Sequence, residues 1–205
     1  YLPRSAEEAF SARRSGISAA ARTRYGLMQY FPDEPVEGAS LALYGESRQD
    51  QLECVAALIA PGATVVEARA GVGAHSIALS RMIGPSGHLL AVEPRSVMQR
   101  ALRQNLAVNR AFNVSLLCRG LGSRPVPGNS KAWAQQDATL TGRVPETEGA
   151  VDTIDGLRLQ RLDLLKIEEG AGAGDVLAGA AETLWRLRPR LYVGVSDASA
   201  LEHVC

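Results

Sequence analysis

Apolar residues recur along this chain with two different spacings. Continuous apolar runs, typical of buried strands, are found at 64–66, 88–93, 113–118, 162–167 and 191–195. Apolar residues three and four positions apart, typical of amphipathic helices, are found at 49–60, 74–83, 94–110 and 173–187. Because strands and helices alternate and crossovers between parallel strands are right-handed, we expect an α/β fold with a mostly parallel sheet and helices on both faces.

The segments outside this alternation are expected to be peripheral. Residues 1–43 are predicted to form an N-terminal helical cap that ends in the proline-rich loop 31–35, and residues 44–205 are predicted to form the α/β domain. Residues 119–160 are rich in Gly, Pro, Ser and Thr and show no strong period. We therefore expect loops and a short hairpin there, with 151–157 as an edge strand.

A glycine turn follows the first predicted strand. Gly71 and Gly73 stand between the run 64–66 and the helical pattern that begins at Ala74. Glycines let the backbone N–H groups at a helix start approach a bulky ligand that a Cβ would exclude. Glu93 ends the second strand 22 residues after Gly71, where α/β nucleotide-binding folds carry the acceptor for two ribose hydroxyls. The pair predicts a nucleoside-containing cofactor.

Composition limits the partners and surroundings. The 205 residues carry 22 basic and 22 acidic side chains, so we expect no nucleic-acid-binding surface, which would need a basic excess or stripe. No apolar run is long enough to span a membrane. Three scattered cysteines (Cys54, Cys118 and Cys205) lack metal-ligand spacing, which favours a cytoplasmic protein without a metal site. Because the chain begins at Tyr1, we expect it to be trimmed or partial; its oligomeric state is unknown.

Several blocks occur in an order known from one family. They are 44–46 (Tyr-Gly-Glu), 61–67, 71–75, 84–87, 91–94, 105–109 and 165–168. With these blocks the chain resembles the FkbM-type methyltransferases, a branch of the S-adenosylmethionine-dependent class I methyltransferases. The resemblance implies a Rossmann-like class I methyltransferase sandwich. It also implies S-adenosylmethionine as the cofactor and methyl transfer to a hydroxyl oxygen of a small molecule, sugar or natural product.

The resemblance also implies roles for individual residues. Those implied to bind the cofactor are Glu67, Arg69, Gly71, Gly73, Glu93 and Tyr44. Three side chains are candidates for catalysis: Lys166, Glu168 and His75. Strand periodicity puts Lys166 and Glu168 on the same side, near the carboxyl end of their strand. The alternatives are a surface ion pair for Lys166 and Glu168, a hydrogen-bonded structural histidine for His75 and a helix-capping acid for Glu67.

Departures from the family pattern support a second hypothesis. Arg69 stands where the family's cofactor loop has its first glycine, and Gly170 and Ala173 stand where acids are usual. The residues after the fifth strand leave little room for the two further strands of the fold. A catalytically degenerate domain that acts as a binding or scaffolding module is therefore the alternative. A nicotinamide-dependent dehydrogenase fits less well, because Ser76 replaces the third glycine of that fingerprint.

Overall fold

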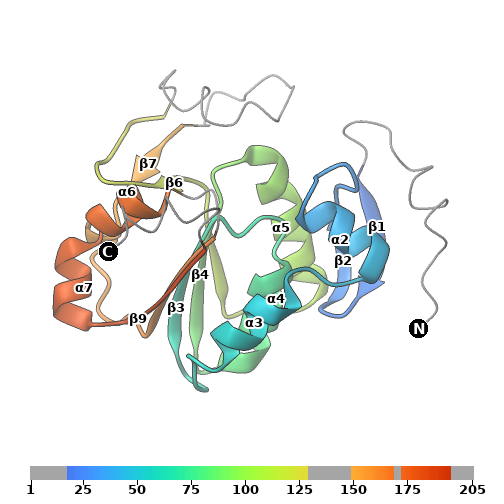
Figure 1. Ribbon diagram of the computed structural model, residues 1–205, viewed down its shortest axis with the longest axis horizontal. Helices are drawn as coiled ribbons and strands as arrows, with labels where there is room; N and C mark the ends of the chain where they lie inside the picture. The colour runs from blue at the N-terminus through green and yellow to red at the C-terminus, as the bar shows by residue number, and fades with distance from the viewer. Residues whose placement is uncertain (1–17, 129–148, 169–171, 195–205) are drawn as a thin grey trace.

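The computed structural model describes residues 18–128, 149–168 and 172–194. Its centre is a five-stranded sheet, in which every pair of neighbouring strands is parallel (Figure 1). The strand order is β5 (Val114–Leu117), β4 (His88–Val92), β3 (Thr64–Ala68), β8 (Leu164–Ile167) and β9 (Arg190–Val193). The predicted α/β fold with a mostly parallel sheet is confirmed.

The connections create a switch point beside β3. From β3 the chain passes through α4 (Ala74–Ile83) to β4 and through α5 (Ser96–Val108) to β5, always moving to one side. It then returns to the other side of β3 with β8 and β9. In open α/β sheets, ligands bind outside the carboxyl ends of the strands where the order reverses. The topology therefore points to the carboxyl ends of β3, β4 and β8.

The two faces of the sheet belong to two apolar cores. On β3, Val65 faces the core formed with α4, α5, the N-terminal hairpin and α3 (Gln49–Ala56), and Val66 faces the core on the opposite side. On β8, Leu164 faces the first core, and Leu165 faces the second. Side chains two residues further along each strand keep these faces, which places Glu67 and Lys166 on the side of α4.

Residues 19–30 do not form the predicted helical cap. They form an antiparallel hairpin of β1 (Ala19–Thr23) and β2 (Gly26–Tyr30), and the first 17 residues lie outside the described part. Met28 and Tyr30 are buried two residues apart, which is a strand period. The buried amide of Asn105 on α5 accepts from the backbone N–H of Gln29 and donates to its carbonyl, so the hairpin is fixed to α5. The helix α2 (Glu37–Tyr44) follows the proline-rich loop.

The edge strand predicted at 151–157 is much shorter than expected. Only β7 (Val151–Asp152) forms, and it pairs in parallel with β6 (Gly120–Leu121), separately from the central sheet. The chain then turns through the 3₁₀ helix Asp155–Leu157. Part of the expected loop region, 129–148, lies outside the described residues.

The helix predicted at 173–187 is divided into α6 (Ala173–Ala178) and α7 (Ala181–Leu187). Gly179 packs so closely on the chain that a Cβ there would lie 2.0 Å from the carbonyl oxygen of Gly122. The Asp155 carboxylate accepts the backbone N–H groups of Glu182 and Thr183, and so caps the start of α7. Burial opposes ionisation of Asp155, but the hydrogen bonds from Thr183 and Glu182 outweigh it and lower its pKa.

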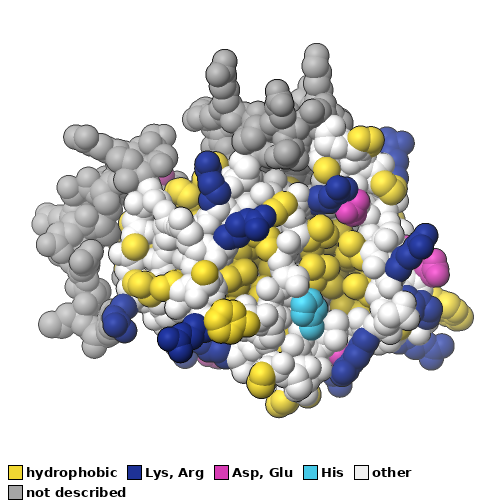
Figure 2. All heavy atoms as spheres, turned by 180° about the vertical axis from the view of Figure 1, so that it is seen from behind, with side chains coloured by type: hydrophobic (Ala, Val, Ile, Leu, Met, Phe, Trp, Pro, Cys, Tyr) yellow, Lys and Arg dark blue, Asp and Glu magenta, His cyan; other side chains and the backbone are white. Residues whose placement is uncertain are grey.

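Two surface properties bear on the expected partners. No described helix is long and apolar enough to cross a membrane. Figure 2 shows the molecule from behind: apolar side chains gather near the centre of this face, and described Lys and Arg side chains are dispersed around them rather than joined in a stripe.

Arg110 offers a test of helix-end geometry. The end of α5 is a Schellman motif, because the N–H of Ala111 bonds to the carbonyl of Leu106 and that of Arg110 to the carbonyl of Ala107. Arg110 is exposed and has the left-handed φ of 55° that favours glycine. We expect Arg110→Gly to raise the free energy of unfolding by about 1 kcal/mol, as measured by urea denaturation. Arg110→Ala, which keeps the Cβ, should give no gain.

Candidate functional site

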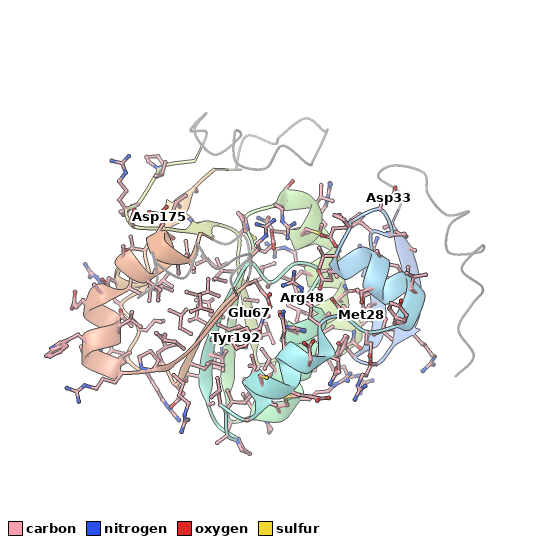
Figure 3. The ribbon with its side chains drawn as sticks, in the orientation of Figure 1. Met28, Asp33, Arg48, Glu67, Asp175 and Tyr192 are labelled. Atoms are coloured by element: carbon pink, nitrogen blue, oxygen red, sulfur yellow. The ribbon has the colours of Figure 1, made fainter. Side chains whose placement is uncertain are left out.

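A cavity of about 320 Å³ opens at the carboxyl ends of β3 and β8 and beside the glycine turn. Its charged wall contains the carboxylates of Glu34, Glu37, Glu67 and Glu168. The opposing charges come from Arg48, Arg69, Arg95 and, when protonated, His75. Elements far apart in sequence meet here: the start of α2, the segment before α3, the turn after β3 and the end of β8. In Figure 3 Glu67 and Arg48 lie in the middle of the molecule.

Lys166 forms the centre of a buried ionic cluster. Its side chain has no solvent exposure, and its Nζ lies 2.9 Å from Oε1 of Glu67, which is its register partner on β3. The same Nζ contacts the carboxylate of Glu168, the first residue after β8. The second oxygen of Glu67 accepts a hydrogen bond of 2.5 Å from the Ser76 hydroxyl on α4. The expected juxtaposition of Lys166 and Glu168 is therefore present, but it is buried and includes Glu67.

His75 connects this cluster to the segment before α3. Its Nε2 lies 3.0 Å from the carbonyl oxygen of Ser47, and its Nδ1 lies 3.3 Å from Oε1 of Glu168. Both partners are acceptors. A neutral imidazole can donate to only one of them, whereas an imidazolium donates to both. The Tyr25 hydroxyl donates to the same Ser47 carbonyl, which holds in place the acceptor that faces Nε2 of His75.

The surroundings hold Glu168 and Lys166 in their ionic forms. Burial raises the pKa of Glu168, but its hydrogen bond with His75 and the charge of Lys166 outweigh burial and lower the pKa well below its usual range. Burial lowers the pKa of Lys166, but the charges of Glu67 and Glu168 outweigh it, and the pKa is raised. A carboxylate with a lowered pKa accepts a proton poorly at neutral pH, and an ammonium group with a raised pKa donates one poorly. The cluster is therefore suited to fixing charge and position.

The glycine turn holds two carboxylates of its own chain. Gly71 has a φ of 61°, and its N–H donates to Glu93 over 2.8 Å. The next N–H, that of Val72, donates to Glu37 over 3.1 Å. Gly73 is required for packing, since a Cβ there would lie 2.3 Å from Cδ1 of Leu102 on α5.

Glu93 is fully buried just after β4 and is clamped by Arg95. One carboxylate oxygen accepts the backbone N–H and the Nε of Arg95, and the other accepts Nη2 of Arg95 and the N–H of Gly71. A carboxylate has about four acceptor positions. A ribose that binds Glu93 must therefore replace the guanidinium of Arg95.

The structure brings most of the predicted site residues together. The cavity wall contains Glu67, Arg69, Gly71, His75 and Glu168, and Glu93 lies directly behind Gly71. Lys166 and Gly73 lie behind the wall rather than in it. Tyr44 is 73% exposed at the end of α2 and does not line the cavity. Gly170 lies outside the described residues, and Ala173 begins α6.

Sequence reasoning missed four charged residues of the wall, Glu34, Glu37, Arg48 and Arg95. Arg95 follows the strand-end acid Glu93 by two residues, a spacing from which their ion pair could have been predicted. Arg48 donates from Nη1 to Glu168 over 3.2 Å, across 120 positions of sequence, and Glu37 reaches Val72 across 35. No local pattern marks either of these two.

The ligand atoms of Glu67, His75 and Glu168 all lie within 4.8 Å of one another, which is close enough for a metal ion. However, the ammonium group of Lys166 contacts both carboxylates. The chain therefore supplies its own cation at this point.

Comparisons with known proteins support the fold. No family model matches the chain. Over 74 residues it is 34% identical to an arsenite methyltransferase of Halobacterium salinarum, a match that covers 36% of this chain and 19% of that protein. The chain thus spans about a fifth of the length of this curated relative.

Two of the solved structures that are similar to this chain are methyltransferases. One is an S-adenosylmethionine-dependent O-methyltransferase from Thermotoga maritima, with a TM-score of 0.50, 14% identity and coverage of 91% of this chain and 59% of the other. The second is methyltransferase FkbM from Methylobacillus flagellatus, with a TM-score of 0.48, 18% identity and coverage of 65% and 33%. The Thermotoga similarity shows that this chain has the Rossmann-like fold found in methyltransferases.

Proposed function

We propose that this protein is an S-adenosylmethionine-dependent methyltransferase whose cofactor binds in the cavity at the carboxyl ends of β3 and β8. The observation that carries the proposal is the 2.8 Å contact between the Gly71 N–H and Glu93. It fixes the strand-end acid of β4 beside the glycine turn of β3, at the edge of a cavity of about 320 Å³. Small-ligand pockets start at about 300 Å³, so the size is adequate.

The residues present fit S-adenosylmethionine. Glu93 supplies the carboxylate for the ribose hydroxyls once Arg95 moves aside, and the arginines of the wall supply partners for the methionine carboxylate. The glutamates of the wall favour the cationic sulfonium and ammonium groups. When bound, the cofactor supplies an electrophilic methyl group.

Lys166, Glu168 and His75 have a positioning role in this proposal. The lowered pKa of Glu168 and the raised pKa of Lys166 make both unsuited to taking a proton from an acceptor. Their contacts instead fix the floor of the cavity between β8 and α4. In-line methyl transfer gains most from holding two reactants in line, so a floor of fixed charges is compatible with it.

We further propose an FkbM-type enzyme that methylates a hydroxyl oxygen of a small molecule, sugar or natural product. The support is the ordered set of sequence blocks, including 61–67, 71–75, 91–94 and 165–168. Glu67, Gly71, Glu93 and Glu168, which these blocks contain, all lie in or directly behind the cavity wall.

Calorimetric titration with S-adenosylmethionine and S-adenosylhomocysteine tests the proposal. We expect micromolar dissociation constants, weakened about 10- to 100-fold in Glu93→Gln, because a hydrogen bond to a charged group contributes about 1.5–3 kcal/mol. Glu182→Gln, an exposed change on α7, is the matched control and should bind like the wild type. Normal binding of the thioether with weak binding of the sulfonium would indicate repulsion by Arg69, which lines the cavity. If the folded chain binds neither compound, the proposal is wrong and the degenerate-domain alternative stands.

A further inference from the structure

The Val72 N–H of the glycine turn is already occupied by an anion that the chain provides. Oε2 of Glu37 accepts the Val72 N–H over 3.1 Å, and Glu37 comes from α2, an element outside the central sheet and its crossovers. The turn leads directly into α4, a helix of 10 residues. Gly73 is the N-cap of α4, so the Val72 N–H belongs to the turn just before the helix, and backbone N–H groups of such turns also bind anions.

Gly71 shows that the position of Glu37 is built into the turn. A Cβ at Gly71 would lie 2.2 Å from Oε2 and 3.1 Å from Cδ of Glu37. The carboxylate therefore rests directly on the glycine backbone, in the space that a turn glycine keeps open for a ligand. The close approach expected of a cofactor is made here by a side chain of the protein.

We propose that Glu37 is a built-in competitor of the cofactor: its carboxylate occupies the Val72 N–H, which together with the arginines of the wall would bind the methionine carboxylate of the cofactor, and cofactor binding displaces it. This inference rests on the proposed function. A carboxylate is the only anionic group of S-adenosylmethionine, so it is the part of the ligand that matches an N–H of this turn. The adenosine part, which we place at Glu93, does not compete with Glu37.

The charges around Glu37 make the competition dependent on pH. Glu34 faces it from the segment before α2, His75 from α4 and Arg95 from the start of α5; Arg48 and Arg69 share the cavity wall. Burial raises the pKa of Glu37 to about 7, and the Val72 N–H and the charges of His75 and Arg95 oppose that rise. As the pH falls through 7 the competitor becomes neutral, so we expect the cofactor to bind more tightly.

Two ligands separate this inference from the proposed function. S-Adenosylhomocysteine has the amino-acid carboxylate, whereas methylthioadenosine has the same adenosine and a thioether but no carboxylate. At pH 8 we expect Glu37→Gln to bind S-adenosylhomocysteine about tenfold more tightly than the wild type, and methylthioadenosine equally well. Glu46→Gln is the control, because Glu46 lies just after α2 and pairs with Arg24 at the surface. It should change neither affinity.

The same titrations at pH 6 and pH 8 give a second readout. In the wild type the ratio of the two affinities should shift toward S-adenosylhomocysteine at pH 6, and in Glu37→Gln it should stay constant. If Glu37→Gln binds S-adenosylhomocysteine no better than the wild type while methylthioadenosine binds both, the competitor role is wrong and the proposed function is untouched. If neither ligand binds any variant, both proposals fall.

Discussion

Glu37→Gln is expected to raise the free energy of unfolding by about 2–3 kcal/mol at pH 8 and to change it little near pH 4.5. Burial raises the pKa of Glu37 from its usual 4.5 to about 7 in the folded chain. Each pKa unit corresponds to about 1.4 kcal/mol. Because the folded state holds this proton more tightly, ionisation favours unfolding, and stability decreases as the pH rises from 4.5 through 7. The amide keeps an oxygen for the Val72 N–H but cannot ionise.

Urea denaturation of the wild type and Glu37→Gln at several pH values between 4.5 and 8 measures this effect. The difference in unfolding free energy should grow across that range and level off above about pH 7.5. Glu46→Gln, an exposed change on the same segment, should give a small difference at all pH values. A constant difference between wild type and Glu37→Gln, or a variant less stable at pH 8, would contradict the raised pKa of Glu37.

Lys166→Met is expected to lower the free energy of unfolding by about 3–5 kcal/mol at pH 7, because removal of one partner leaves a buried charge uncompensated. Lys166 and Glu67 are 0% and 1% exposed, and Glu168 is 13% exposed, so water can do little to replace the ammonium group. Methionine has a similar length and fills the same space. The loss therefore reports charge rather than volume.

A double-mutant cycle of Lys166 and Glu67 separates the effect of lost charge from the effect of lost volume. In Lys166→Met the Glu67 carboxylate has lost its cation, so adding Glu67→Gln should recover part of the stability. We expect a coupling free energy of about 1–3 kcal/mol from denaturation of the four proteins. Additive losses would show that Lys166 and Glu67 do not interact through charge. Arg161→Met is the control, because Arg161 pairs with Asp163 at the surface. It should lower the free energy of unfolding by less than about 1 kcal/mol.

Much of the central fold follows from local patterns in the sequence. The buried runs around Val65, Leu89 and Leu164 mark strands that are covered on both faces, and the spacing between them leaves room for crossover helices. Period-two alternation also placed Lys166 and Glu168 on one side of β8. The contact with Glu67 needs one further fact, the register of β3 against β8, which pairs Glu67 with Lys166.

The parts that sequence reasoning missed depend on distant contacts. The segment around Met28 pairs with β1, and it is fixed to the domain by Asn105, which lies 76 positions from Gln29 and bonds to the other edge of β2. The break between α6 and α7 depends on Gly179 touching Gly122. Glu37 reaches the glycine turn only because α2 packs beside it. None of these contacts has a signal within a few residues of the positions involved.

The groups that occupy the space beside the two turn glycines also come from distant parts of the chain. The sequence predicts Gly71 and Gly73 as turn glycines that let a ligand approach the backbone, and both have a positive φ, 61° and 91°. A positive φ does not reveal which group occupies the space that the missing Cβ leaves. At Gly71 this group is the carboxylate of Glu37, and at Gly73 it is the side chain of Leu102.

A crystal structure of the chain with S-adenosylhomocysteine tests the central claim most directly. We expect both ribose hydroxyls within hydrogen-bond distance of the Glu93 carboxylate, with the Arg95 guanidinium displaced from its present contacts with that carboxylate. The ligand should fill the cavity between the glycine turn and Glu168. A ligand bound elsewhere, or an Arg95 and a Glu37 that keep their present contacts at saturating ligand, would contradict the account.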